Sequence, residues 1–279
     1  MNLLKETRQI LRIHGVVPKK KLGQNFLVDK EALCRMVSYA AIDKRDIVLE
    51  IGAGLGFLTE LLADKARRVI AVEIDPKIIG VLEIRLSSRE NVTVLQGNIL
   101  KIDVPAFDKV VSTPPYSISS PLLLWLLEKD LKRAVLAFQE EFAKKLVASP
   151  GSADYGYLAV ATYYRGEVEL LDAIPRDAFW PQPRVGSVIV RFAPRKPPFP
   201  LEDESLFFDL TRMLFTQKNR KMRNAILPFF SKRGIPKSRA SELADTLPFG
   251  YRRPRELTPE EIGLTANEIT RKMRELRFS

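Results

Sequence analysis

A short apolar run that ends in a cluster of glycines constrains the fold of this chain more than any other feature of its sequence. Residues 47–51 are mostly apolar, three glycines lie within residues 52–56, and residues 57–66 have helical spacing. A second apolar run, residues 69–73, ends at Glu73. This order predicts two neighbouring strands joined by a turn and a helix, and the glycines let the turn approach a ligand closely.

The carboxylate of Glu73 indicates the class of ligand. At the end of a strand in a doubly wound sheet, an acidic residue can accept hydrogen bonds from both hydroxyls of a ribose. We therefore predict a binding site for S-adenosyl-L-methionine. The spacing would also fit a dinucleotide, and a tight turn without a ligand would explain the glycines but not Glu73.

The charge of the chain indicates a polyanionic partner. The 45 Lys and Arg residues exceed the 34 Asp and Glu residues, which gives a net charge of +11. Basic residues cluster in residues 19–21, 218–223 and 252–255. Each cluster alone would fit a solvated surface, but three clusters on a basic protein favour binding to a phosphate backbone. Binding to a membrane surface fits less well, because no cluster lies on a long helix with a strong apolar face.

The cysteine and histidine content and the hydropathy exclude several classes of protein. Cys34 is the only cysteine and His14 the only histidine, so neither a disulfide within the chain nor a Cys/His metal cluster can form. No apolar run is long enough to span a bilayer, and the N-terminal residues lack the apolar core of a signal peptide. We therefore expect a cytoplasmic protein that holds no metal, and a monomer is the simplest expectation.

The middle of the chain alternates between strand-like and helix-like segments, from residue 46 to about residue 194. This alternation predicts an α/β fold, a doubly wound and mostly parallel sheet with helices on both faces. The predicted strands cover residues 47–51, 69–73, 92–96, 109–112, 133–139, approximately 159–164, and 185–192. Helices should follow the first, second, fourth and fifth strands, and those with the clearest spacing cover residues 57–66, 119–128 and 140–147.

A proline-rich segment, residues 194–200, predicts a linker. Beyond it, a small all-helical domain is predicted from the helical spacing of residues 204–215, 222–230, 238–247 and 259–277. We therefore divide the chain into a catalytic domain that binds S-adenosylmethionine, residues 1–195, and a helical RNA-binding domain, residues 196–279.

The turn Thr113-Pro114-Pro115-Tyr116 follows the predicted strand 109–112, at the edge where doubly wound sheets bind ligands. The exocyclic amine of adenine or cytosine is a poor nucleophile because its lone pair is delocalised, so a methyl-transfer site must hold the amine with acceptors. The side-chain oxygen of Thr113 and the carbonyl of Pro114 can each accept one amine proton. Tyr116 can stack on a base that has left its helix. An ordinary proline turn would also fit these residues.

Together with these motifs, the chain resembles the small-subunit ribosomal RNA adenine dimethyltransferase family, whose members add two methyls to N6 of each of two neighbouring adenosines near the 3′ end of the RNA. The resemblance is carried by residues 21–29, 50–56, 72–75, 116–121, 138–143, 154–156 and 179–187. Residues 23–27 and 179–187 are specific to the family, whereas many methyltransferases share the glycine turn. The run 154–156 is most similar to archaeal and eukaryotic members.

The resemblance implies a Rossmann-like class I methyltransferase fold and a role for individual residues. At the cofactor it places Gln24, Asn25, Leu27, Gly52, Gly54, Glu73, Ile74, Asn98 and Thr113. At the target adenine it places Thr113, Pro114, Pro115, Tyr116 and Phe179, the last two as a sandwich around the base, although core packing would also explain Phe179. At the small-subunit rRNA of a precursor particle it places Lys218, Arg220, Lys221 and Arg223.

Two residues depart from the family pattern, in which Asp is usual at the position of Asn98 and Asn at that of Thr113. The amide oxygen of Asn98 can still accept from the adenine amine of the cofactor, although more weakly than a carboxylate. At Thr113, a misplaced acceptor would cost about 2 to 4 kcal/mol in the transition state, which slows transfer roughly a hundredfold or more.

Three hypotheses follow. The leading one is dimethylation of adenosine N6 in small-subunit rRNA during ribosome biogenesis, by direct transfer from S-adenosylmethionine. The second is a ribosome-assembly factor that binds pre-rRNA and whose methyltransferase activity is weak or lost because of Thr113 and Asn98. The third, a DNA methyltransferase, rests on residues 113–116 alone, and residues 23–27 argue against it.

Overall fold

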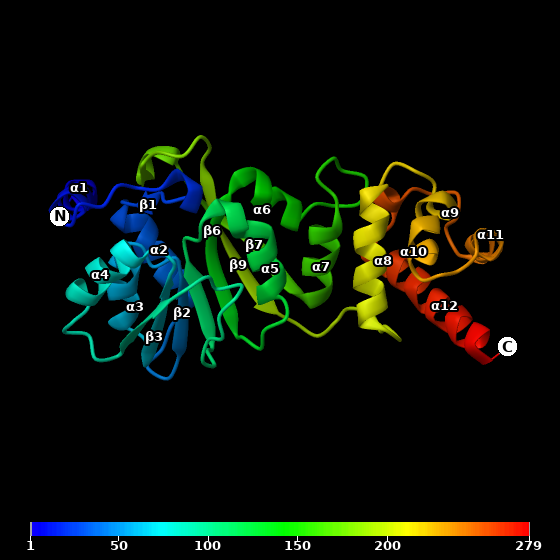
Figure 1. Cartoon of the computed structure of the whole chain (residues 1–279), viewed down its shortest axis with the longest axis horizontal. Coiled ribbons are helices and arrows are strands. Elements are labelled where there is room, and N and C mark those ends of the chain that lie inside the picture. Colours follow the sequence, from blue (N-terminus) through cyan, green and yellow to red (C-terminus); the bar gives the residue numbers. More distant parts are fainter. Residues whose placement is uncertain (1, 279) are drawn as a thin grey trace. The chain divides into compact units, whose positions relative to one another are not determined.

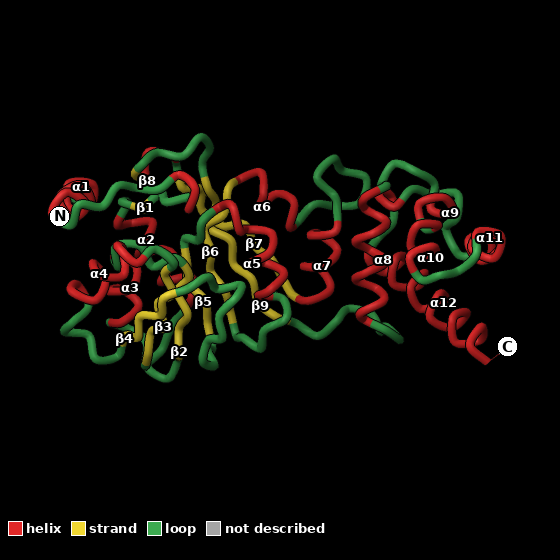
Figure 2. Tube along the Cα trace, in the orientation of Figure 1, coloured by secondary structure: helices red, strands yellow, loops and turns green. Residues whose placement is uncertain are grey.

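The computed structural model describes residues 2–278, which form two compact units. One unit contains the residues up to 143 together with residues 167–194, and the other contains residues 144–166 together with the residues from 195 onward. Figure 1 labels the elements of both units, and Figure 2 shows where their helices and strands lie.

The first unit is built on a seven-stranded sheet with the strand order β4-β3-β2-β5-β6-β9-β7. Adjacent strands from β4 to β6 are parallel, and β9 pairs antiparallel with β6 (Figure 1). The strands are β2 (Ile47–Ile51), β3 (Arg68–Glu73), β4 (Val92–Gln96), β5 (Lys109–Ser112), β6 (Arg133–Gln139), β7 (Gly166–Ile174) and β9 (Ser187–Pro194). After β2 the chain forms β3 and β4 on one side of β2, and it then forms β5 on the other side of β2. The carboxyl ends of β2 and β5 therefore form the switch point where such sheets bind ligands.

Several helices pack on this sheet through the apolar residues of one core. Helix α2 contacts β5 and β6, α3 contacts β3, and α4 contacts β3 and β4. The helices are α1 (Leu3–Ile13), α2 (Lys30–Ala40), α3 (Phe57–Ala63), α4 (Pro76–Arg85), α5 (Ser119–Leu126) and α6 (Glu140–Leu146), with 3₁₀ turns η1 (Lys20–Leu22), η2 (Tyr116–Ile118) and η3 (Arg176–Ala178). Asp29 caps α2, and Asp75 caps α4 by accepting from the backbone amide of Lys77.

A second, two-stranded sheet joins segments that are far apart in the sequence. Strand β1 (Phe26–Leu27) pairs antiparallel with β8 (Phe179–Trp180), so that Leu27 lies opposite Phe179. The backbone amide of Val28 extends the pairing by donating to the carbonyl of Ala178 at 2.8 Å. This sheet brings the two family-specific runs of the sequence side by side.

The second unit is all-helical and has its own apolar core. Its helices are α7 (Tyr157–Arg165), α8 (Glu204–Thr216), α9 (Met222–Ala225), α10 (Leu227–Lys232), α11 (Lys237–Thr246) and α12 (Pro259–Phe278), with a 3₁₀ turn η4 (Pro254–Glu256). Helix α8 contacts α7, α9, α10 and α12. Among the described residues, no helix is both long and apolar enough to cross a membrane.

The predicted α/β architecture with a helical C-terminal part is confirmed, but one predicted strand is wrong. Residues 159–164 lie in helix α7, and the strand that follows is β7. Residues Ala159, Val160 and Tyr164 are buried in the core of the helical unit, where packing overrides the strand preference of valine and tyrosine. The predicted helix 222–230 is divided into α9 and α10.

The segment 144–166 also packs with the helical unit, whereas the sequence places it in the domain of residues 1–195. The chain thus enters the helical unit, returns to the sheet through β7, and crosses again after residue 194. The division of labour between a catalytic and an RNA-binding domain stays a prediction.

Candidate active site

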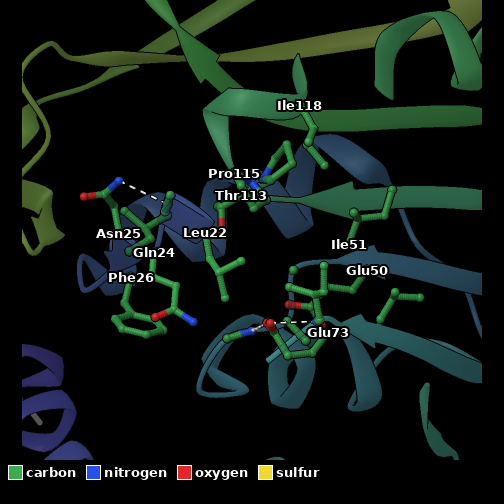
Figure 3. A pocket seen from close by; sticks show the side chains of 18 of the residues that line it. Leu22, Gln24, Asn25, Phe26, Glu50, Ile51, Glu73, Thr113, Pro115 and Ile118 are labelled. Atoms are coloured by element: carbon green, nitrogen blue, oxygen red, sulfur yellow. Dashed lines mark hydrogen bonds between the residues drawn. The ribbon is translucent and has the colours of Figure 1, made fainter. Parts of the chain in front are cut away.

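One pocket at the carboxyl ends of β2, β3 and β5 contains the predicted catalytic and cofactor residues (Figure 3). It is lined by Gln24, Asn25, Leu27, Gly52, Gly54, Glu73, Ile74, Asn98, Thr113, Pro114, Pro115, Tyr116 and Phe179. All of these belong to the first unit. The predicted RNA-binding residues lie in the second unit.

The glycine turn after β2 forms part of the wall of this pocket. Gly52 and Gly54 have φ of +74° and +57°, a backbone conformation that other residues adopt only with strain. The amide of Gly52 donates to the carbonyl of Val72 at 2.8 Å and thereby attaches the turn to β3. A Cβ on Gly52 would lie 3.2 Å from Cδ of Pro115, and a Cβ on Gly54 would lie 3.2 Å from the ring of Phe26. A side chain at either position would therefore narrow the pocket.

Glu73 lies at the end of β3 with its carboxylate held by backbone amides. Its Oε2 accepts from Gly54 at 3.0 Å, and its Oε1 accepts from Ile74 at 2.8 Å and from Asp75 at 2.9 Å. The side chain is buried, and burial raises its pKa, although the three amides favour the charged form. The carboxylate is thus fixed in orientation before any ligand arrives.

Glu50 is a second buried carboxyl at this pocket, and sequence reasoning did not single it out. Only 2% of the residue is exposed, and burial raises its pKa to about 8. Its Oε2 has no hydrogen-bond partner among the described residues, although Glu50 lines the pocket. An unsatisfied buried acceptor is costly, so a donor on a bound ligand would relieve it. The signal in the sequence was a carboxylate inside an otherwise apolar strand directly before the glycines.

The N-terminal segment over the pocket is tied to α4 by a buried carboxylate. Asp75 accepts from Nζ of Lys19 at 2.9 Å and from Nε2 of Gln24 at 2.8 Å, and it is fully buried. Oε1 of Gln24 accepts from the backbone amide of Lys19 at 2.7 Å. Both ends of the Gln24 amide are therefore used within the protein. Its side chain positions the segment, while Nδ2 of Asn25 donates to the carbonyl of Gly23 at 3.2 Å (Figure 3).

The turn after β5 places Thr113 and Tyr116 at the pocket. Thr113 is half-buried, and Figure 3 shows it beside Pro115 across the pocket from Glu73. The hydroxyls of Tyr116 and Ser187 share a hydrogen bond at 2.7 Å, and burial raises the pKa of Tyr116. Ser187 is thus a positioning residue that sequence reasoning did not assign.

The two rings predicted to sandwich a base do lie near each other. The centroids of Tyr116 and Phe179 are 6.4 Å apart, with an interplanar angle of 69°. This is an edge-to-face contact, so a base would enter between them only after one ring turns. Phe179 is 3% exposed and belongs to the apolar core, so the alternative of core packing describes its present surroundings.

Asn98 lies in the turn after β4, where its side chain is already engaged. Its Oδ1 accepts from the backbone amide of Leu100 at 3.0 Å. One lone pair of Oδ1 and the amide nitrogen remain for a ligand. The expected acceptor therefore has a structural task, and Asn98 faces the pocket with fewer free acceptor positions than a carboxylate would.

In the helical unit, the predicted RNA-binding residues differ in their exposure and in their hydrogen bonds within the unit. Nζ of Lys218 donates to the carbonyl of Ala153 at 2.8 Å, so this ammonium is partly used inside the unit. Arg220, Lys221 and Arg223 are exposed. No group of three or more His, Cys, Asp or Glu among the described residues is arranged to hold a metal ion.

Comparison with known proteins identifies the family of this chain. A model of the family described as "Ribosomal RNA adenine dimethylase" matches residues 17–258. The chain is 44% identical over 248 residues, 88% of its length and 91% of the relative's, to a Methanosarcina acetivorans protein named "Probable ribosomal RNA small subunit methyltransferase A". A Pyrococcus abyssi protein of the same name is 35% identical over 96% of this chain and 97% of its own length.

Two crystal structures are similar along nearly their whole length. A dimethyladenosine transferase from Plasmodium falciparum has a TM-score of 0.75 and 26% identity, covering 88% of this chain and 97% of that chain. The 23S rRNA methyltransferase ErmE has a TM-score of 0.65 and 29% identity, covering 88% of this chain and all of its own. These similarities show that the chain belongs to the ribosomal RNA adenine dimethylase family.

Proposed function

We propose that this protein dimethylates N6 of adenosines near the 3′ end of small-subunit rRNA, with S-adenosylmethionine as the methyl donor. The observation that carries the proposal is the pocket itself. It unites the run 23–27, the glycine turn and the turn 113–116 at the switch point of the sheet, and Phe179 closes it. The Methanosarcina acetivorans relative and ErmE are named as rRNA methyltransferases, which supports the substrate class.

The residues at the pocket fit the proposed cofactor. The buried carboxylate of Glu73 suits a ribose, and the unpaired Oε2 of Glu50 suits the ammonium of the cofactor's amino-acid end. Gly52 and Gly54 leave room where side chains would fill the pocket. S-adenosylmethionine supplies an electrophilic methyl group on a sulfonium, so the chain itself needs only to bind, orient and exclude water.

The chain's own residues must make the adenine amine nucleophilic. The hydroxyl oxygen of Thr113 and the carbonyl oxygen of Pro114 would each accept a hydrogen bond from one amine N–H, which favours a pyramidal nitrogen and frees its lone pair. As the nitrogen bonds the methyl group, the sulfonium would leave as a neutral thioether, and the methylated nitrogen would lose one N–H proton to solvent. In the second transfer one N–H remains, so one of the two acceptors would be used. While its oxygen accepts from the amine, the Thr113 hydroxyl must direct its own O–H toward a group other than the amine. Tyr116, held by Ser187, provides a face for the base, and the exclusion of water by the surrounding apolar residues strengthens both hydrogen bonds.

The RNA would be held by the helical unit, through the exposed cations Arg220, Lys221, Arg223 and Arg253. The substrate would be a precursor of the small ribosomal subunit, in the cytoplasm, and we expect a monomer to act on so large a particle. Sedimentation of the purified protein at micromolar concentration tests the oligomeric state.

A second function is favoured by a specific observation. Asn98 spends its side-chain oxygen on Leu100, and Thr113 offers a hydroxyl where an amide is usual in the family. Both changes weaken acceptors, so an assembly factor that binds pre-rRNA with little turnover is the alternative.

One experiment separates the two functions. Unmodified small-subunit particles are incubated with S-adenosylmethionine and either the native protein, a Thr113→Asn variant or a Glu73→Ala variant, and the nucleosides are analysed by mass spectrometry. Dimethyladenosine from the native protein, lost with Glu73→Ala, supports the enzyme. Product from Thr113→Asn alone supports the assembly factor. If neither the native protein nor the Thr113→Asn variant yields product while both bind the particles, the proposed activity is wrong.

A further inference from the structure

A strained turn in the helical unit holds one aromatic ring in solvent. Tyr251 is 77% exposed, whereas Phe249, two residues earlier, packs against the core of the unit. Phe249 has a φ of +61°, which is rare for a bulky residue. Such strain persists only where the surrounding structure enforces it, and it concentrates at functional sites.

Hydrogen bonds to the start of α9 enforce this turn. The amide of Met222 donates to the carbonyl of Arg252 at 2.7 Å, and the amide of Arg223 donates to the carbonyl of Gly250 at 3.1 Å. The amide of Arg252 also donates to the carbonyl of Phe249 at 3.0 Å. The position of the Tyr251 backbone is therefore fixed against the basic run 218–223.

Two cations lie near the exposed ring. Nζ of Lys221 lies 5.7 Å and Cζ of Arg223 lies 5.9 Å from the ring centroid of Tyr251. Both side chains are exposed, and the ion pair of Arg223 with Asp245 is long, at 3.8 Å. The ring thus sits among positive groups that are poorly neutralised by the protein.

This combination matches the chemistry of an unpaired nucleotide. A base offers a flat π face for the ring, and its phosphates offer anions for the two cations. A duplex would not fit as well, because its bases already stack on each other. A protein partner of ordinary composition would meet cations where its own apolar contact should be.

We propose that Tyr251 is a stacking platform for one unpaired base of the rRNA, with Lys221 and Arg223 contacting the phosphates next to that base. The proposal rests on the proposed function, because that function makes small-subunit rRNA the ligand. It adds a base-contacting residue to a surface for which the sequence indicated phosphate contacts alone.

The test measures the affinity of unmodified small-subunit particles for the full-length protein across a range of salt concentrations. Tyr251→Ala should weaken binding about tenfold, which is a typical effect of losing one base stacked on an aromatic side chain. Its salt dependence should stay unchanged because no phosphate contact is lost. Tyr251→Phe should bind like the native protein. The double change Lys221→Ala and Arg223→Ala should instead flatten the slope of log affinity against log salt by about 1.4.

Tyr163 provides a matched control. It is also an exposed tyrosine of this unit, with Cζ of Arg195 4.8 Å from its ring, but its hydroxyl is bound to Glu260. Tyr163→Ala should change the affinity less than twofold. An equal loss in Tyr163→Ala and Tyr251→Ala would overturn the proposal, as would native affinity in Tyr251→Ala.

Ultraviolet cross-linking of the native complex identifies what contacts the ring. A cross-link from Tyr251 to an rRNA nucleotide supports the proposal, and one to a ribosomal protein overturns it. The two proposals fail differently. If the native protein neither binds nor methylates the particles, the proposed function is refuted and this inference with it. If the native protein does both and Tyr251→Ala binds equally well, the stacking site alone is wrong.

Discussion

The buried carboxyl of Glu50 should make the stability of this protein depend on pH in a way that one substitution removes. Burial raises the pKa of Glu50 from 4.5 to about 8. In the unfolded chain the group returns to its ordinary value and ionises near pH 4.5. Between these two pH values the unfolded state releases a proton that the folded state keeps. The folded state is therefore favoured at low pH, and this contribution is lost as the pH rises toward 8.

The magnitude follows from the size of the shift. Each unit of pKa corresponds to about 1.4 kcal/mol, so the relative free energy of unfolding should fall by about 3 to 4 kcal/mol between pH 5 and pH 8. Glu50→Gln keeps the shape of the side chain but cannot ionise, so its stability should lack this component. Groups that do not interact with Glu50 titrate equally in both proteins and cancel in the comparison. Glu73 is the exception, because its charge contributes to the raised pKa of Glu50.

Urea unfolding of the native protein and of Glu50→Gln, at half-unit steps from pH 5 to pH 9, measures the difference. The two stability curves should diverge steadily to the advantage of the variant and run parallel above pH 8. Parallel curves over the whole range would refute the assignment of a raised pKa to this carboxyl. A constant offset would not matter, because it reports the hydrogen bonds of the new amide and not ionisation.

The same carboxyl gives a second readout with S-adenosylmethionine. An ammonium placed next to Glu50 would favour its charged form, so binding at pH 7 should release up to one proton per site. Calorimetry in two buffers with different ionisation enthalpies measures that release. The native protein should show it and Glu50→Gln should not. Equal enthalpies in the two buffers for the native protein would place the ammonium elsewhere.

Three further changes test hydrogen bonds and an ion pair in the two units. Gln24→Ala removes a hydrogen bond from buried Asp75 and frees the N-terminal segment, so calorimetry should show about fivefold weaker cofactor binding, and unchanged affinity would contradict the positioning role. The Lys109 ammonium lies 2.7 Å from the carboxylate of Asp46, and Asp46→Asn removes this buried partner. Urea unfolding should show that the free energy of unfolding falls by about 3 kcal/mol. A fall of less than about 1 kcal/mol would mean that solvent replaces the pair. Lys218→Ala removes a donor to backbone carbonyls, so it should lower the melting temperature by a few degrees while the salt dependence of particle binding hardly changes, and the reverse result would make Lys218 an RNA contact.

The parallel strands of the sheet could be predicted from the sequence because each is a short apolar run that ends in a turn. Strands β4, β5 and β6 have the predicted bounds, and β2 does as well. Residues 159–164 gave the wrong prediction because a short buried run has the same composition in a helix and in a strand. What distinguishes them is the partner, here the core of the helical unit, and no local pattern contains that information.

The site was predictable to the extent that its chemistry is local. The glycine turn, Glu73 and the turn 113–116 each have a reason that can be read from adjacent residues. The pairing of β1 with β8 has none, since two-residue strands more than a hundred residues apart carry no periodic signal. Ser187 and the tie of Gln24 to Asp75 depend on the same long-range geometry.

The two departures from the family pattern should act on different steps of the reaction. Oδ1 of Asn98 already accepts from Leu100, so one lone pair of this oxygen is left for an exocyclic amine of the cofactor. A neutral oxygen shared in this way accepts more weakly than a carboxylate, so we expect the change at Asn98 to affect cofactor affinity and therefore KM. We propose that the turn with Thr113 meets the target amine, so we expect the change at Thr113 to affect kcat. Thr113→Asn should then raise kcat without tightening cofactor binding. Asn98→Asp should tighten cofactor binding without raising kcat. If either variant changed both parameters equally, the two residues would share one ligand, and the separation of cofactor and target sites within this pocket would be wrong.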